Sequence, residues 1–100
     1  MKTSKIRQSA CGQDCLVRVP GICNGNPETV VLAHINGGGV GMKAHDIHGA
    51  YCCSDCHTFL DGGYVKTVTR EYRDLLHLEG VVRTQLKLIE SGFIEVRGAA

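Results

Sequence analysis

The stretch CSDCH, residues 53–57, is the part of the sequence that decides the fold. Two cysteines three positions apart are typical of one half of a zinc site. The same letters also match C-x-x-C-H, the attachment signal of c-type haem. Residues 1–15 contain no apolar signal-peptide segment, and c-type haem is attached outside the cytoplasm. We therefore expect a cytosolic chain that binds metal and carries no haem.

The composition also favours a metal. The chain has 100 residues, six cysteines, five aromatic residues and no Trp, which predicts one domain over residues 1–100 with a modest aliphatic core. Domains of this size often need a metal or a disulfide to be stable. Disulfides are uncommon in the cytosol, so clustered cysteines there more often bind metal.

Charge and hydropathy limit the possible partners. The net charge of +1 says little about DNA binding, because nucleic-acid binders are often strongly basic and this chain is not. No apolar run approaches the roughly 18–20 residues that span a bilayer, so we expect no membrane partner. Contact with DNA is left to two local groups of basic residues: Lys2, Lys5 and Arg7, and Arg70, Arg73, Arg83 and Lys87.

Hydrophobic periodicity and turn residues predict an α+β chain. In the last helix, apolar residues recur at spacings near three and four, which predicts an inward face made of Val68, Tyr72, Leu75, Val82, Leu86 and Ile89. Gly80 would kink that helix or allow close packing. The predicted elements are short helices over 3–10 and 54–61, the second capped by Ser54, strands over 15–19, 30–35, 49–52 and 93–97, a glycine-rich loop over 36–43, and a long helix over about 67–91.

The cysteines offer more than one ligand set. Cys53 and Cys56 form one pair, and their partners must come from Cys11, Cys15 and Cys23. Cys15 and Cys23 flank a strand and its turn, so we favour a zinc site made of Cys15, Cys23, Cys53 and Cys56. Cys11 with Cys15 is the competing pair. On the favoured set Cys11 and Cys52 are free thiols, and four thiolates leave no open position for substrate, so the zinc is structural.

Histidines and carboxylates surround the predicted zinc site in the sequence. His34 ends the clearest strand, Asp46 and His48 precede the second cysteine pair, and His57 and Asp61 share one helix face. Phosphodiester hydrolysis needs a base near neutral pKa and a cation that neutralises the departing oxygen. Imidazole and carboxylate groups suit these two roles.

The ordered set LAHINGGGVGMKAHD, residues 32–46, and CCSDCH, residues 52–57, resembles the zinc-supported HNH, or His-Me finger, endonucleases. Residues 15–35 and 49–57 are similar to the small prophage-encoded YbcO family of nucleases, and more distantly to the RecA-dependent phage nuclease Ref. The resemblance runs from about Cys15 to Asp61. It implies a zinc-stabilised ββα-metal finger over about 15–62, followed by the long C-terminal helix.

The resemblance also implies roles for single residues. His34 matches the general base that activates water, and His57 matches a ligand of a catalytic Mg²⁺ or Mn²⁺ ion. Asp46 falls nearest the motif's middle Asn, with His48 as the alternative, and is assigned with Asp61 to the metal. Ala33 stands where many HNH enzymes carry an acidic or His ligand. The implied function is DNA cleavage, with a recombination protein such as RecA as a partner; the alternative is a catalytically silent zinc module that binds nucleic acid or protein.

Overall fold

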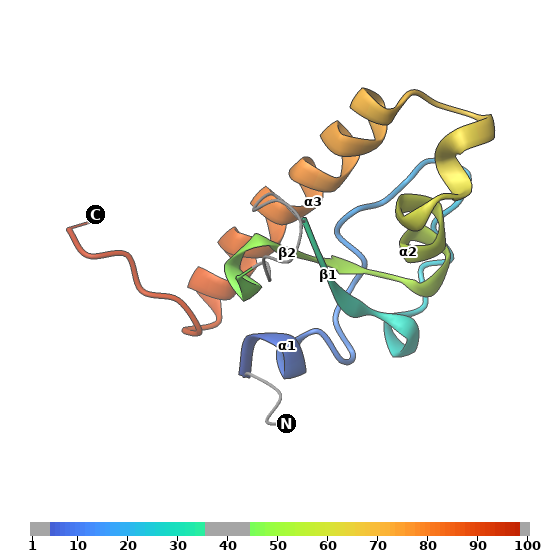
Figure 1. The fold of residues 1–100 in the computed structure, drawn as a ribbon. Helices are drawn as coiled ribbons and strands as arrows, with labels where there is room; N and C mark the ends of the chain where they lie inside the picture. Colours follow the sequence, from blue (N-terminus) through green and yellow to red (C-terminus); the bar gives the residue numbers. More distant parts are fainter. Residues whose placement is uncertain (1–4, 36–44, 99–100) are drawn as a thin grey trace.

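The computed structural model describes residues 5–35 and 45–98 and has the α+β composition that the sequence predicts. Figure 1 shows a two-stranded sheet with the long helix α3 along one side and the short helix α2 at one end. The elements are α1 (Lys5–Ser9), η1 (Pro27–Thr29), β1 (Val31–His34), η2 (Asp46–His48), β2 (Gly49–Cys52), α2 (Ser54–Asp61), η3 (Gly63–Lys66) and α3 (Arg70–Glu90).

The sheet places His34 at the end of its strand. Strands β1 and β2 are antiparallel, with Val31 opposite Cys52 and His34 opposite Gly49. Every residue of β2 is buried, since α3 packs over this strand. On its other edge, Tyr51 O accepts a 2.8 Å hydrogen bond from Leu16 N. His34 is therefore the last residue of β1, at the end of a well-packed pair of strands.

Helix α2 starts directly after β2 and ends where the sequence predicts. Its N-cap is Cys53, whose Sγ accepts a hydrogen bond from Cys56 N; the predicted cap, Ser54, is the first helical residue instead. Gly62 ends the helix with φ 156°, a conformation that L side chains rarely adopt. A sulfur therefore replaces the usual hydroxyl cap, and the helix start depends on a cysteine.

Two predicted strands are wrong. Residues 15–19 form an irregular segment, because Arg18 takes a left-handed backbone conformation with φ 52°, outside the extended range of a regular strand. Residues 93–97 follow α3 as irregular chain, and the described residues give them no strand partner. The long helix begins at Arg70, three residues later than predicted, because the Thr69 side chain accepts from Tyr72 N and caps it.

The inward face of α3 also differs from the prediction. The buried residues are Gly80, Val81, Thr84 and Leu88. Five of the six residues predicted to face the core are exposed instead, namely Tyr72, Leu75, Val82, Leu86 and Ile89. The helix is therefore apolar on two sides, and the periodicity picked out the side that faces away from the sheet.

Small and polar groups explain which side of α3 packs inward. A Cβ at Gly80 would lie 2.8 Å from Val17 Cγ2 and 3.2 Å from Ala50 Cβ, so only glycine lets the helix come this close to β2. Thr84 Oγ1 accepts a 2.9 Å hydrogen bond from Tyr51 N and donates to Gly80 O. The contact thus gives the β2 backbone a partner that a larger aliphatic side chain could not provide.

Some predictions fall outside the part of the chain that the structure describes. The glycine-rich loop over 36–43 and the first residues of the N-terminal helix are among them. None of the helices within 5–35 and 45–98 combines the length and the hydropathy needed to cross a membrane.

Candidate metal centre and histidine pocket

Four cysteines meet at one end of the sheet. The Sγ atoms of Cys15, Cys23, Cys53 and Cys56 all lie within 4.8 Å of one another. Cys15, Cys53 and Cys56 are buried, whereas Cys23 is partly exposed. Four thiolate sulfurs are a donor set that zinc prefers, so this group could hold a metal ion. It is the same set that the sequence spacing favours.

Local hydrogen bonds explain how two distant segments meet there. A turn brings Cys23 back, because its N–H donates to Val19 O at 3.0 Å. The next residue, Asn24, donates to Ser54 Oγ and Asp55 Oδ2, both at 3.1 Å. The 19–24 loop is therefore fastened to the first turn of α2, which carries the second cysteine pair.

The two remaining cysteines lie outside the group. Cys11 is exposed and Cys52 is fully buried. The Cys52 thiol stays protonated, because its hydrogen bond to Cys15, together with burial, raises its pKa. The same hydrogen bond lowers the pKa of Cys15 to about 4. Cys15 is therefore set up as a thiolate, the form that binds metal.

His34 is paired with a carboxylate. Its Nε2 lies 2.7 Å from Asp46 Oδ1, and both side chains are mostly buried. Asp46 begins the 3₁₀ turn η2, and Arg7 Nη2 approaches the same carboxylate oxygen at 3.4 Å. The strand end and the turn before β2 thus form a His–Asp pair.

His57 forms a second, looser pair on α2. Its Nε2 lies 3.7 Å from Asp61 Oδ2, one helical turn away, and both side chains are substantially exposed. His34, His57 and Asp61 all line one open pocket of about 520 Å³. The pocket lies between the end of β1, helix α2 and the first half of α3. The order of elements that the sequence predicts therefore brings three of the four predicted chemical residues to one opening.

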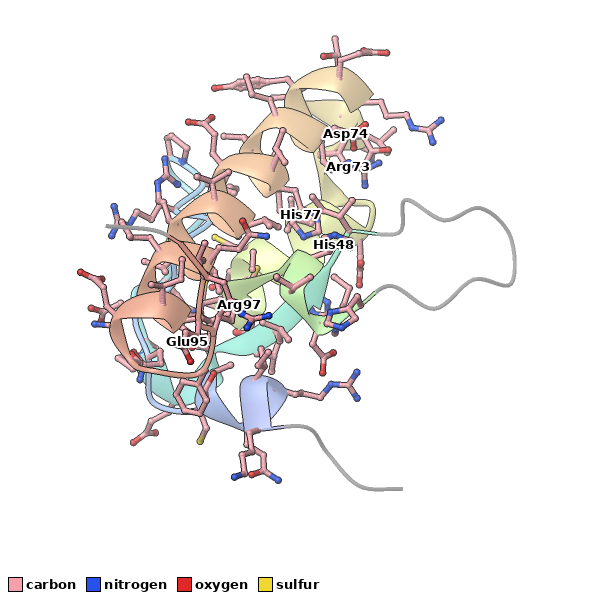
Figure 2. The ribbon with its side chains drawn as sticks, turned by 90° about the vertical axis from the view of Figure 1, so that its left-hand side faces the viewer. His48, Arg73, Asp74, His77, Glu95 and Arg97 are labelled. Carbon is pink, nitrogen blue, oxygen red and sulfur yellow. The ribbon has the colours of Figure 1, made fainter. Side chains whose placement is uncertain are left out.

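Helix α3 supplies the third wall of the pocket. Figure 2 shows Arg73, Asp74 and His77 along one side of this helix, and all three line the pocket with Arg70. Three contacts hold Arg73: Nη1 donates to Leu60 O at 2.6 Å, Nε donates to Asp74, and the guanidinium stacks over Tyr64. Arg73 therefore joins the end of α2 to α3.

His77 fixes the strand that carries His34. Its Nε2 lies 2.8 Å from Ala33 O, so this nitrogen carries the proton and donates. Burial lowers the pKa of His77, and the positive charge of Arg73 adds to that effect. A neutral His77 thus bridges α3 and the residue before His34.

The predicted residues do not all converge. Asp46 and His48 are absent from the described residues that line the pocket. Asp46 still contacts a lining residue, because its Oδ1 lies 2.7 Å from His34 Nε2. Within the described ranges, the four cysteines are the one group of three or more His, Cys, Asp or Glu side chains close enough to hold a metal ion. The predicted catalytic ligands His57, Asp46 and Asp61 are not gathered in this way.

Sequence reasoning missed two ionisable residues of the pocket, Asp74 and His77. The available signal was the second helical face of α3, on which Arg73, His77, Gly80 and Thr84 recur at spacings of three and four. These residues are small or polar, so a search for apolar periodicity passes over them.

The fold and the site define a small α+β protein with a four-cysteine group able to hold a metal and an adjoining histidine pocket. The family model described as "Putative nuclease YbcO" matches residues 4–93. The chain belongs to this family.

Individual relatives support the same assignment. "Putative nuclease YbcO" of Escherichia coli (strain K12) and its counterpart in Enterobacteria phage 82 are each 41% identical to this chain, over 90% of its length and 96% of theirs. A solved "putative bacteriophage protein" from Escherichia coli is similar with a TM-score of 0.74 and 42% identity, covering 88% of this chain and all of that one.

Proposed function

We propose that the chain is a metal-dependent endonuclease of the HNH type that hydrolyses phosphodiester bonds in DNA. One observation carries the proposal: His34 at the end of β1 and His57 at the start of α2 line the same pocket, and His57 directly follows a cysteine of the four-cysteine group. The order strand, strand, helix matches the finger that the resemblance implies. The name of the family supports a nucleic-acid substrate.

The four-cysteine group would hold a structural zinc ion. Cys15 and Cys23 come from the loop before β1, and Cys53 and Cys56 from the start of α2. Ligation would fix the first turn of α2 against that loop. Because His57 is on this turn, the zinc site would determine where its imidazole lies in the pocket.

His34 would act as the general base. Its Nε2 donates to Asp46, which leaves Nδ1 to accept a proton from the attacking water. A carboxylate held at 2.7 Å fixes the ring orientation and favours the imidazolium that forms. This geometry favours a positioning role for Asp46 over the metal-ligand role that the resemblance implies.

His57 and Asp61 would hold the catalytic Mg²⁺ or Mn²⁺ ion. An imidazole and a carboxylate suit such a cation, and both side chains are exposed to the pocket. When bound, the cation supplies the positive charge that the departing oxygen needs. Mg²⁺ sites commonly use one or two protein ligands and complete the shell with water and phosphate oxygens.

Arg70 would help to place the DNA backbone. It is the first residue of α3 and lines the same pocket as His57 and Asp61. Contacts between arginine and phosphate position a DNA duplex without reading its sequence. Arg73 is less suited to this role, because its guanidinium already holds Leu60 O and Asp74.

Cleavage of supercoiled plasmid with Mg²⁺ or Mn²⁺ tests the base directly. A general base contributes about 10²–10⁴-fold to rate, so His34→Ala should lower cleavage by at least roughly 100-fold. Zinc content should match the wild type, because His34 is not one of the four cysteines, and circular dichroism checks that the variant is folded. Full cleavage by rigorously purified His34→Ala protein would exclude His34 as the base.

A matched pair of carboxylates on α2 tests the metal site. Asp61 lines the pocket, whereas Asp55 accepts a hydrogen bond from Asn24 on the side of the cysteines. Asp61→Ala and His57→Ala should weaken binding of Mn²⁺ to the zinc-loaded protein and reduce cleavage. Asp55→Ala should leave Mn²⁺ binding unchanged, once its zinc content is shown to match the wild type, because Asp55 contacts the loop that carries Cys23. Equal effects of the two aspartate variants would contradict the assignment.

A catalytically silent zinc module is the second candidate. It is favoured by the histidine pocket itself, in which the described residues gather no three-ligand group. This candidate predicts zinc binding, no cleavage by either the wild type or His34→Ala, and no Mn²⁺ binding at the pocket. No described feature bears on a recombination-protein partner, which stays a prediction.

A further inference from the structure

The outer side of α3 carries an apolar surface that is exposed. We call it the outer stripe; its side chains are between 42% and 59% exposed and belong to Leu75, Leu78, Val82, Leu86 and Ile89. In Figure 1 no other described element lies beyond α3 on this side. A helix that is apolar on both faces is normally buried on both. An exposed stripe of five aliphatic side chains therefore indicates an interaction surface.

We propose that the outer stripe joins two copies of this chain in an antiparallel, twofold-symmetric dimer. The spacings along the stripe are three, four, four and three residues, so the pattern is symmetric about Val82. A twofold interface must be self-complementary. When α3 pairs antiparallel about Val82, Leu78 meets the partner's Leu86, and Leu75 meets the partner's Ile89. Every such contact is aliphatic on both sides.

Charges beside the stripe fit the same arrangement. Glu79 and Arg83 lie along one edge and form an exposed ion pair with Nη2 3.4 Å from Oε2. A twofold axis between antiparallel helices sets each edge against the same edge of the partner. Glu79 precedes Val82 by three residues, and Arg83 follows it by one. In the antiparallel pair, Glu79 and the partner's Arg83 therefore lie on the same side of the twofold axis, and their positions along the helix axis differ by two residues, or about 3 Å. Two reciprocal ion pairs can therefore form across the dimer.

This self-complementarity favours a second copy of the chain as the partner that binds the outer stripe. The stripe contains no basic residue, which argues against the DNA backbone as its ligand. From Leu75 to Ile89 it extends about 21 Å, at 1.5 Å per residue. That length fits an interface at or below the standard size of about 800 Å² per partner, a class that includes weak, reversible complexes. We take a micromolar dissociation constant as the expectation to be tested.

The dimer would also affect the histidine pocket. Leu78 belongs both to the outer stripe and to the lining of the pocket. The partner's Leu86 would cover Leu78 and extend that wall. Because Asp74 and His77 lie on the same side of the stripe as the pocket, the two pockets would open on one face of the dimer. Only this last consequence rests on the proposed function.

Sedimentation of the zinc-loaded chain tests the association. Between about 1 and 200 µM, a range around the expected constant, the wild type should shift from monomer to dimer. Val82→Arg places two charges at the symmetry axis and should stay monomeric. Val65→Arg is the control, because Val65 is 67% exposed but lies on η3, outside the stripe. A monomeric wild type at the highest concentration, or equal dimerisation of Val82→Arg, overturns the proposal.

A charge exchange tests the antiparallel register. Glu79→Arg should weaken dimerisation about tenfold, because two ion pairs become two repulsions. Adding Arg83→Glu to the same chain should restore it. Since Arg83 also donates to Leu16 O, far-ultraviolet circular dichroism checks that the double variant is folded. A folded double variant that dimerises no better than Glu79→Arg contradicts the register.

The two proposals fail separately. Dimerisation is measured without DNA or a catalytic metal, so an inactive protein that dimerises through the stripe contradicts only the proposed nuclease. A monomer that cleaves DNA contradicts only the dimer.

Discussion

The cysteine group and the histidine pocket share helix α2 but differ in how complete they are. Four Sγ atoms lie within 4.8 Å of one another, and three of the four cysteines are buried. In the pocket, His34 and His57 each have a carboxylate partner, but the pairs are separate and His57 and Asp61 are exposed. In the cysteine group, which would stabilise the fold, the protein itself supplies all four sulfur ligands. The part that would do chemistry is left open to water, cation and substrate.

The largest expected effect comes from breaking the cysteine group. Cys56→Ser removes one sulfur from a buried site, and a structural zinc site supplies much of the folding free energy of a small domain. We expect loss of bound zinc and of the cooperative melting transition, measured by elemental analysis and circular dichroism. Cys11→Ser changes an exposed cysteine outside the group and should keep both properties. A normal melt for Cys56→Ser would mean that the fold does not need the metal.

The next effect separates the chemistry of the pocket from its structure. Asp46→Asn keeps the size of the side chain but removes the negative charge beside His34 Nε2. We expect cleavage to fall roughly 10-fold to 100-fold, a part of what the base contributes. Zinc content should not change, and neither should Mn²⁺ binding. If Mn²⁺ binding falls instead, Asp46 is a metal ligand as the resemblance implies.

A change at the contact between α3 and β2 should affect stability but not the metal. Gly80→Ala improves helix propensity by about 1 kcal/mol, yet its Cβ would lie 3.1 Å from the Val17 backbone and cannot be accommodated without movement. We expect a net loss of about 1–2 kcal/mol in the free energy of unfolding, measured with urea. Lys87→Ala, at an exposed position of the same helix, should change it by less than about 0.5 kcal/mol.

The smallest effect concerns pH. Burial lowers the pKa of His77 in the folded chain, so the unfolded chain, with a pKa near 6.5, binds the proton first as the pH falls. Folding stability should therefore decrease from pH 7 towards the lowered pKa. His77→Gln should lose this part of the pH dependence. The measurement is the difference between wild type and variant in urea midpoints at pH 7 and pH 6. An identical pH dependence would mean that His77 is not protonated differently on unfolding.

Local signals in the sequence were sufficient for the centre of the fold. Strand β2 and helix α2 lie where predicted, and Gly62 ends the helix as expected. The ligand spacing favoured the four cysteines whose Sγ atoms lie within 4.8 Å of one another, although it also left Cys11 with Cys15 as a competing pair. These features depend on neighbours in the chain and on simple geometry.

The rest depended on tertiary packing. Arg18 breaks the first predicted strand through its backbone conformation, which its residue type does not indicate. Helix α3 turns Gly80 and Thr84 inward because the β2 backbone needs a close partner and a hydrogen bond, and apolar periodicity cannot show that need. His77 was missed because its hydrogen bond to Ala33 O likewise has no counterpart in apolar periodicity. The pairing of Asp46 with His34 likewise follows from the register of the two strands.

Gly80 also affects when α3 can form. A glycine at the centre of a 21-residue helix lowers its stability in isolation, and few isolated helices persist in water. Helix α3 should therefore gain its structure only as it docks on β2, and it should not serve as an early folding unit. Hydrogen exchange at the Thr84 amide and the Tyr51 amide should then proceed through the same global opening, with equal protection. One missing side chain would thus make helix and sheet a single cooperative unit in folding.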